Sequence, residues 1–281
     1  MECKVTQCTI ENGVGTVYLD RPGRGNSWTM QMNVEYRWRM AQLDANPDVR
    51  VIVVTGTGRQ FCVGADMKAL DHYSDTGEDY AQSVRDNDLE KPGFGVRREY
   101  DHDMVWHWGL RKPVIAAMNG ACAGIALTLA AFCDLRYGAI GSKFTTAGPR
   151  LGLPSEYGLS WVLPRLVGVT HAADIMLTGR IFLAEEAKEM GFLNAVYPFE
   201  EFRKRVAETA NHMAQQNSPA AMLTSKRQLY AELMQHDVGK SVEASKDLIG
   251  EHMLSDDYKE GVDAYQNGRP PQFAGLGGGN S

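Results

Sequence analysis

Two apolar segments that each end in a run of small residues constrain the fold of this chain most strongly. The first is Val51–Val54, which is followed by a glycine-containing turn and then by Phe61–Lys68. The second is Val114–Met118, which is followed by the small-residue run Asn119–Ala126. Short apolar runs bounded by glycines are typical of strands buried in a parallel sheet. The sequence therefore predicts two buried strands that each break off at small residues before a helix.

Both breaks have the same chemical consequence. A strand that ends in Gly64-Ala65-Asp66, or a helix that begins after Gly120 and Gly124, leaves backbone N–H groups without a partner. Two such N–H groups aimed at one point form an oxyanion hole, which is a strong electrostatic device in acyl chemistry. We therefore expect a substrate with a carbonyl group whose oxygen becomes an enolate.

The first two thirds of the chain alternates predicted strands with predicted helices. Apolar spacing predicts a helix over Thr29–Leu43. Its buried stripe consists of Met32, Tyr36, Met40 and Leu43. Further strands are predicted at Gly15–Leu19, Leu135–Tyr137 and Asn194–Tyr197. This alternation is typical of an α/β protein with parallel strand pairing.

Beyond about Pro198 the pattern becomes purely helical. Helices are predicted over Phe199–Gln216, from Pro219 onward, and over Val238–Leu254. The last eight residues, 274–281, are small and polar, so we expect them to be disordered.

The segment Asp71–Trp108 is long for a connection between two strands. Connections of this length are often lids or pocket walls, so we expect one here. Its last part, Tyr100–Trp108, is rich in aromatic residues and histidine and is predicted to be helical. Trp106 and Trp108 then point to opposite sides of that helix, so at most one of them lines a pocket.

Composition excludes several classes of function. The chain has 281 residues, 43% hydrophobic residues and a net charge of −6, which gives no general basic field for nucleic acid or anionic membrane. No apolar run has the length of a membrane span or a signal segment. The five cysteines form no CxxC pair, and no His/Cys/Asp/Glu group has metal-ligand spacing. We expect a cytoplasmic location, no metal, no nucleic acid and no membrane.

The two small-residue segments resemble those of the enoyl-CoA hydratase/isomerase (crotonase) family. The resemblance continues in order along nearly the whole chain, through Asp20–Pro22, Cys133–Tyr137, Leu151–Pro154, Leu163–Gly168, Leu177–Arg180, Ala184–Ala187, Gly191–Val196, Glu260–Val262 and Pro271–Phe273. It implies an α/β fold built as a spiral of ββα units, with a C-terminal helical trimerisation region. The implied organisation is a spiral core with the acyl-CoA site over residues 1–197 and a helical oligomerisation region with a flexible tail over residues 198–281. The resemblance also implies a homotrimer or a hexamer, and no cofactor other than the coenzyme A of the substrate.

By the same resemblance, the oxyanion hole consists of the backbone N–H groups of Ala65 and Ile125. This chain has Gly124-Ile125-Ala126 where the family commonly has three glycines, which narrows the site without removing the N–H group. The two glutamates that family hydratases use are replaced by Thr128 and Gly148. Neither replacement acts as a carboxylate base at neutral pH.

Glu156 is the acid that remains, and two interpretations of it stay open. It falls where family members that shift double bonds carry their single working carboxylate. It also falls where a predicted helix, Ser155–Val167, begins, and a glutamate in a first helical turn is a common capping residue. Pro164 should bend that helix.

Substrate contacts are implied at dispersed positions by the resemblance. These positions are Arg24, Asn26, Val63, Asp66, Met67, Lys68, Thr128, Gly148 and Phe273. Arg24 and Lys68 are the phosphate partners expected from their charge. The Gly56-Thr57-Gly58 turn does not fit a dinucleotide fingerprint, because the third glycine position is Phe61.

The combined expectation is an acyl-CoA enzyme of fatty acid metabolism that moves a proton at the α-carbon through a thioester enolate. Isomerisation of an enoyl-CoA double bond is the preferred reaction, because one carboxylate suffices for it. The alternatives are an enoyl-CoA hydratase with a non-standard acid set and an acyl-CoA binding protein without activity.

Overall fold

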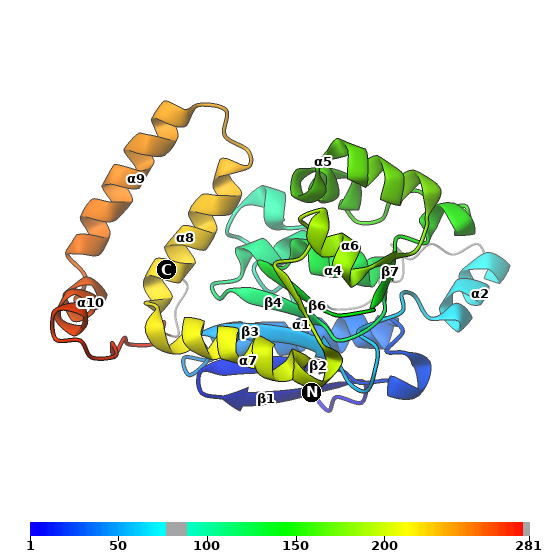
Figure 1. Cartoon of the computed structure of the whole chain (residues 1–281), viewed down its shortest axis with the longest axis horizontal. Helices are drawn as coiled ribbons and strands as arrows, with labels where there is room; N and C mark the ends of the chain where they lie inside the picture. Colours follow the sequence, from blue (N-terminus) through cyan, green and yellow to red (C-terminus); the bar gives the residue numbers. More distant parts are fainter. Residues whose placement is uncertain (77–88, 278–281) are drawn as a thin grey trace.

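The computed structural model describes residues 1–76 and 89–277. Its centre is a six-stranded sheet with the order β1-β2-β3-β4-β6-β9 (Figure 1). The strands are β1 (Thr6–Glu11), β2 (Val14–Leu19), β3 (Val51–Gly56), β4 (Val114–Met118), β6 (Leu135–Ala139) and β9 (Ala195–Tyr197). β1 and β2 pair antiparallel, and all later neighbours pair parallel. The predicted parallel α/β architecture is confirmed.

A smaller layer of short strands lies beside this sheet. It contains β5 (Cys122–Ala123), β7 (Lys143–Thr145) and β8 (Phe182–Leu183) in the order β5-β7-β8. An isolated bridge between Cys62 and Cys122 extends the layer to the segment after β3. Each of β3, β4 and β6 is thus followed by a short pairing in the second layer and then by a helix. This repeat is the spiral of ββα turns that the resemblance implied.

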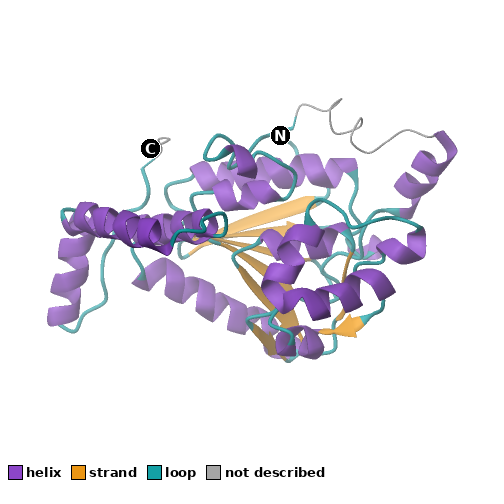
Figure 2. Ribbon diagram, turned by 90° about the horizontal axis from the view of Figure 1, so that it is seen from above, coloured by secondary structure: helices purple, strands orange, loops and turns teal. Residues whose placement is uncertain are grey.

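Helices cover both faces of the sheet (Figure 2). They are α1 (Met30–Ala45), α2 (Met67–Thr76), α4 (Ile125–Phe132), α5 (Leu159–Thr178), α6 (Ala184–Glu189) and α7 (Phe199–Gln216). α1 buries the predicted stripe, Met32, Tyr36, Met40 and Leu43, in the main core. α7 buries Phe202 and Val206 against the opposite face of the sheet. Fully burying one large apolar side chain contributes about 1.5–3 kcal/mol, so both faces add to stability.

The C-terminal helices are those predicted, with one addition. α7 and α8 (Pro219–Glu232) match the expected starts, and α9 (Val238–Met253) ends within a residue of the expected position. α10 (Asp256–Gln266) was not predicted. α7 packs on the sheet, whereas α9 and α10 lie farther from it (Figure 1). Of the tail predicted to be disordered, residues 278–281 lie outside the described residues.

The predicted helix over Tyr100–Trp108 is wrong. Two short 3-10 turns, Arg98–Tyr100 and Val105–Gly109, replace it. Met104 separates them with a φ of 64°, which is incompatible with a continuous helix. Trp106 and Trp108 are both buried, and they contact different groups of side chains. Part of the segment predicted to form a lid, residues 77–88, lies outside the described residues.

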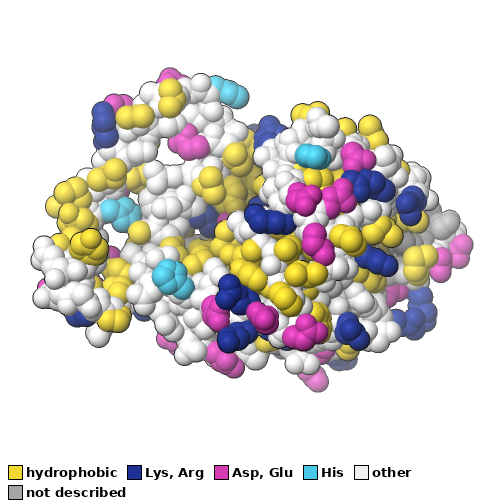
Figure 3. Space-filling model, viewed as in Figure 1, with side chains coloured by type: hydrophobic (Ala, Val, Ile, Leu, Met, Phe, Trp, Pro, Cys, Tyr) yellow, Lys and Arg dark blue, Asp and Glu magenta, His cyan; other side chains and the backbone are white. Residues whose placement is uncertain are grey.

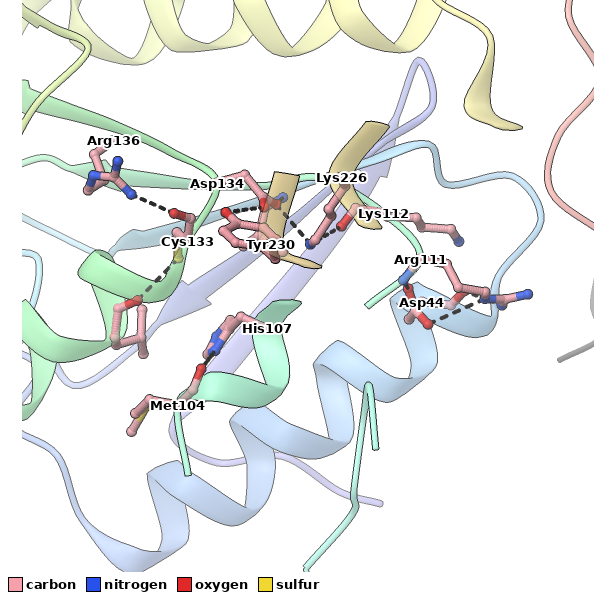
Figure 4. Close-up of polar contacts among 12 residues, drawn as sticks. Asp44, Met104, His107, Arg111, Lys112, Cys133, Asp134, Arg136, Lys226 and Tyr230 are labelled. Atoms are coloured by element: carbon pink, nitrogen blue, oxygen red, sulfur yellow. Dashed lines mark hydrogen bonds and ion pairs between the residues drawn. The ribbon is translucent and has the colours of Figure 1, made fainter. Parts of the chain in front are cut away.

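A buried polar network fastens α8 to the core (Figure 4). The Asp134 carboxylate, which follows α4, accepts hydrogen bonds from Lys226 Nζ at 2.8 Å and from the Tyr230 hydroxyl at 2.7 Å. It also accepts one from the Val114 N–H at 2.6 Å. Lys226 donates in addition to the Lys112 carbonyl at 3.0 Å, and its side chain is buried. One carboxylate therefore joins β4 to two residues of α8.

Removing the cation of this network should destabilise the protein strongly. We expect Lys226→Met to lower the free energy of unfolding by about 3 kcal/mol, because the mostly buried Asp134 carboxylate loses its ion-pair partner. Chemical denaturation at one protein concentration measures the change. The control is Lys246→Met, since Lys246 forms an exposed pair with Glu243 that contributes at most about 1 kcal/mol. Equal losses in the two variants would contradict the role given to the network.

Two kinds of feature are absent from the described part of the chain. Within residues 1–76 and 89–277, every helix is too short or too polar to cross a membrane. The same residues contain no group of three His, Cys, Asp or Glu side chains placed to share a metal ion.

Candidate active site

The two small-residue segments predicted to form an oxyanion hole lie side by side. The Cys62 N–H donates to the Ala121 carbonyl at 3.0 Å, and the Ala123 N–H donates to the Cys62 carbonyl at 3.1 Å. Gly64 packs so closely that a Cβ atom on it would lie 3.2 Å from the Ala123 carbonyl oxygen. Position 64 favours glycine for two reasons: a Cβ atom would crowd this carbonyl, and the backbone φ is +99°, a conformation that other residues rarely adopt. The pairing runs parallel, so it brings Ala65 alongside the start of α4.

The N–H groups of Ala65 and Ile125 have no hydrogen-bond acceptor within residues 1–76 and 89–277. On one side of Ala65, the Trp28 N–H donates to the Gly64 carbonyl, and the Asp66 N–H donates to the Trp28 carbonyl. Since peptide groups alternate along an extended chain, the Ala65 N–H points away from Trp28, toward the paired segment. Ile125 is the first residue of α4, where helical N–H groups are unpaired and directed outward. This geometry suits the binding of one anionic oxygen, and Ala65 is exposed to receive it.

The Ile125 side chain does not narrow the site. It is 5% exposed and packs in the main core, so only its backbone faces outward at the start of α4. Gly124, which precedes it, has a φ of 53° and a ψ of −123°, a conformation that only glycine adopts readily.

The Glu156 carboxylate lies next to the start of α4. A Cβ atom placed on Gly124 would be 3.7 Å from Glu156 Oε2. Gly124, Gly148 and Glu156 line one small cavity together with Thr146 and Ser155. The structure therefore brings together Glu156, the position of one missing hydratase acid and the Ile125 N–H group.

Glu156 is not a helix-capping residue, so that interpretation is wrong. α5 begins at Leu159 rather than Ser155, and Gly158 is its N-cap residue. Tyr157 and Gly158 have φ values of 44° and 82°, which keep the chain before Leu159 out of the helical conformation. Pro164 lies within α5, and the break in the helix comes at Gly168, where φ is 77° and ψ is 161°.

The environment of Glu156 favours proton transfer. Burial raises the pKa of its carboxyl group above the ordinary value of 4.5. Within the described part of the chain, the side chain forms no hydrogen bond or ion pair. A half-buried carboxylate with a raised pKa, beside the unpaired Ile125 N–H group, has the chemistry that a general base requires.

The other two positions of interest in this region carry no acid. Thr128 lies one turn along α4 from Gly124, and its hydroxyl is buried without a partner among the described residues. Gly148 begins a 3-10 turn, and a Cβ atom on it would approach the Leu153 carbonyl oxygen to 3.0 Å. A side chain at position 148 would therefore require the Leu153 carbonyl to move by a few tenths of an ångström.

Asp66, the acid next to Ala65, is engaged in structure. It accepts hydrogen bonds from the Ser27 hydroxyl at 2.8 Å and from Arg21 Nη1 at 2.9 Å. The Ser27 hydrogen bond and the Arg21 guanidinium hold the pKa of Asp66 below its ordinary value, against the effect of burial. These contacts fix the loop before α1 against the Ala65 segment. Ser27 was not singled out from the sequence, and Arg21 was named only as part of the segment Asp20–Pro22.

Asn26 supports the same loop from inside. Its side-chain amide donates to the carbonyls of Thr57 and Gln60, at 3.0 and 2.8 Å, and accepts from the Arg21 N–H. The residue is fully buried. Its part in substrate binding stays a prediction.

The remaining predicted contact residues fall into two groups. Arg24, Val63, Met67 and Lys68 are all exposed on the two segments beside Ala65. The Val63 N–H donates to the Gly25 carbonyl at 3.1 Å, which joins these segments. Phe273 lies elsewhere, because its carbonyl accepts from Arg50, at the opposite end of β3. Arg50 and Ala65 lie beyond opposite ends of β3, and a strand of that length spans about 20 Å. Phe273 and Ala65 of the same chain are therefore far apart.

Comparisons with known proteins show the family and the fold. The family model for enoyl-CoA hydratase/isomerase matches residues 9–276. The 1,2-epoxyphenylacetyl-CoA isomerase of Escherichia coli is 32% identical over 95% of this chain and 97% of its own. The peroxisomal Delta(3,5)-Delta(2,4)-dienoyl-CoA isomerase of Arabidopsis thaliana is 30% identical over 97% of both chains. A crystal structure of a probable enoyl-CoA hydratase/isomerase from Mycobacterium abscessus superposes with a TM-score of 0.82 at 30% identity, covering 96% of this chain and 99% of that one.

The chain therefore belongs to the enoyl-CoA hydratase/isomerase family and has the crotonase fold. It is an enzyme of the isomerase or lyase class.

Proposed function

We propose that this enzyme isomerises the double bond of an enoyl-CoA thioester. The Ala65 and Ile125 N–H groups bind the thioester oxygen, and Glu156 moves the proton. Glu156 removes a proton from C2 of a 3-enoyl thioester, which gives a dienolate with its negative charge on the bound oxygen. The same carboxyl group then returns the proton to C4, so that the product is the 2-enoyl thioester. Atoms and charge balance without water or a second acid.

The observation that supports this proposal most is that, in the described part of the chain, Glu156 is the one carboxylate lining the small cavity at the start of α4. Glu156 Oε2 lies near Gly124, whereas the two positions of the hydratase acids hold Thr128 and Gly148. Hydration needs a water molecule activated on the substrate as well as a proton at C2, while a double-bond shift needs one base. The similar Arabidopsis thaliana protein is named a dienoyl-CoA isomerase, which favours a double-bond shift here as well.

Product analysis tests the proposal. The full chain is incubated in D₂O with a 3-enoyl-CoA and, separately, with a 2-enoyl-CoA, and the products are followed by NMR. We expect conversion of the 3-enoyl to the 2-enoyl thioester, with little 3-hydroxyacyl product. Rapid formation of the 3-hydroxyacyl thioester would favour the hydratase alternative. Binding of both thioesters without conversion of either would favour a protein that only binds acyl-CoA.

The pH dependence should report the raised pKa of Glu156. A base works when it is ionised, so we expect kcat/KM to fall as pH decreases through a pKa above 4.5. The contribution of Glu156 to the free energy of unfolding changes with pH in the opposite direction. Burial favours the protonated form in the folded state, so the contribution of Glu156 is greatest at low pH and is lost as pH rises through the raised pKa. An acidic limb at or below 4.5 in the kcat/KM profile would contradict the assignment.

A homotrimer or hexamer is part of the same proposal, and α9 supports it. α9 has no buried residue in the described chain. Its exposed apolar side chains Val238, Val242, Ile249 and Met253 lie along one face. Hydrophobic side chains gather over the region of α9 and α10 in Figure 3. Contiguous exposed apolar surface of this kind marks a protein–protein contact.

A charge on that face should break the assembly. We expect Ile249→Glu to convert the trimer or hexamer to monomer, because the carboxylate would be buried without a partner in the contact. Light scattering after size-exclusion chromatography measures the mass. The control is Lys240→Glu, which makes a charge change at an exposed position of the same helix and should leave the mass unchanged. An Ile249→Glu protein of unchanged mass would refute this interface.

A cytoplasmic location of the enzyme remains our proposal as well.

A further inference from the structure

A cavity lined by aromatic side chains lies next to Glu156. Its volume is about 460 Å³, within the range of small-molecule sites. The walls that matter here are formed by Trp108, Phe132, Tyr157, Trp161 and Met234. These residues come from four separate parts of the chain: the turn before β4, the end of α4, the start of α5 and the segment after α8.

The cavity lies close to the proposed active site. α4 carries the Ile125 N–H at its first residue and Phe132 at its last, and these are about 10 Å apart at 1.5 Å per residue. The chain Glu156–Gly158 runs along the same helix. Glu156 lies beside Gly124 at one end, and a Cβ atom on Gly158 would be 3.4 Å from the Phe132 ring at the other. A thioester bound at Ile125 therefore has the cavity within reach of its acyl group.

The aromatic wall is rigid. Trp108 stacks on Tyr230 with 4.4 Å between ring centroids and meets Phe132 edge-on at 5.1 Å. Trp161 packs against Trp108 at 5.7 Å, and the Arg165 guanidinium lies 3.7 Å from the Trp161 ring centroid. Rings held in this way are pre-organised to pack against a planar group, which lowers the ordering cost of binding.

The charge of the lining excludes one class of acyl group. The polar residues at the cavity are Glu99, His102 and Asp103, and no Lys or Arg lines it among the described residues. Asp103 is paired with Arg37, and Glu99 with Arg97. A carboxylate at the far end of an acyl chain would therefore meet acidic groups and find no cation of its own.

We infer that this cavity selects an uncharged aryl group at the end of the acyl chain. The inference rests on the proposed function, because it assumes that the thioester binds at Ala65 and Ile125. It goes further by naming the substrate class as aryl-acyl thioesters in preference to straight-chain and dicarboxylic ones.

Binding of three thioesters with eight acyl carbons tests the inference. The probes are phenylacetyl-CoA, octanoyl-CoA and the monothioester suberyl-CoA, and affinity is measured by titration calorimetry on the full chain. We expect phenylacetyl-CoA to bind about tenfold more tightly than octanoyl-CoA, because stacked rings contribute beyond their buried area. We expect suberyl-CoA to bind at least tenfold more weakly than octanoyl-CoA. Equal affinities for phenylacetyl-CoA and octanoyl-CoA would overturn the inference.

Two variants locate the preference. Trp161→Ala should weaken phenylacetyl-CoA binding about tenfold and octanoyl-CoA binding less than threefold. Val105→Phe, which fills the cavity from another wall, should also abolish the preference. The control is Trp38→Ala, because Trp38 is a half-buried tryptophan on α1, outside the cavity. Equal weakening of both ligands by Trp161→Ala, or loss of the preference in Trp38→Ala, would count against the cavity.

The outcomes separate this inference from the proposed function. If all three thioesters bind without preference while double-bond migration occurs, the cavity assignment fails and the function stands. If no thioester binds, the proposed function fails, and the inference fails with it.

Discussion

Glu156→Gln should abolish double-bond migration while leaving thioester binding nearly intact. We expect kcat to fall at least about 10³-fold, because general acid–base groups typically contribute 10²–10⁴-fold and, among the described residues, no second carboxylate lines the small cavity beside Gly124. The affinity for a saturated acyl-CoA should change less than about threefold, since glutamine keeps the size of the side chain. Single-turnover kinetics and calorimetry measure the two quantities.

Two further variants make this test specific. Glu189→Gln removes an exposed carboxylate on α6, so it should retain wild-type kcat. Glu156→Asp keeps the acid and shortens its reach, so activity should be reduced but present. Turnover of Glu156→Gln near the wild-type rate would remove Glu156 from the mechanism. Loss of binding in this variant would assign it to the binding of substrate instead.

Ile125→Pro should remove one donor of the oxyanion hole with little effect on the fold. Proline has no N–H group and is well tolerated at the first residue of a helix, which is the position of Ile125. The Ile125 N–H has no acceptor among the described residues, so no hydrogen bond within the chain is lost. We expect kcat to fall about 10²–10³-fold, the cost of losing one such donor.

Ile125→Pro also replaces the buried isoleucine side chain, and a second variant controls for that change. Ile125→Ala keeps the N–H and removes buried apolar groups from the core, so it should lose stability and remain within about tenfold of wild-type kcat. Thermal denaturation of both variants shows whether a loss of activity follows from unfolding. If Ile125→Pro is folded and fully active, the backbone donor at this residue has no catalytic part.

The sequence predicted the framework because its signals are local. Apolar runs bounded by glycine gave β3 and β4, and the 3.6-residue stripe of Met32, Tyr36 and Met40 gave α1. The pairing of the two small-residue segments was also accessible, since both follow neighbouring parallel strands and so reach the same sheet edge.

The features that were not predicted depend on backbone conformation or on distant contacts. The stretch from Ser155 to Val167 has continuous helical spacing, and only Gly158 signals that α5 begins later. Met104 adopts a positive φ without any glycine or asparagine to indicate it, so the region around Trp106 looked helical. The aromatic cavity is formed by residues up to 135 positions apart in the sequence, from Glu99 to Met234, and hydrophobic periodicity does not relate residues so far apart.

The most direct test of the account is a crystal structure of the full chain with a saturated acyl-CoA thioester. We predict that the thioester oxygen lies about 2.7–3.1 Å from the backbone nitrogens of both Ala65 and Ile125. We also predict that the Glu156 carboxylate lies within hydrogen-bonding reach, about 2.6–3.2 Å or slightly more, of the carbon atom that loses its proton. A thioester oxygen bound elsewhere, with the two N–H groups bonded to the protein or to solvent, would contradict the central claim.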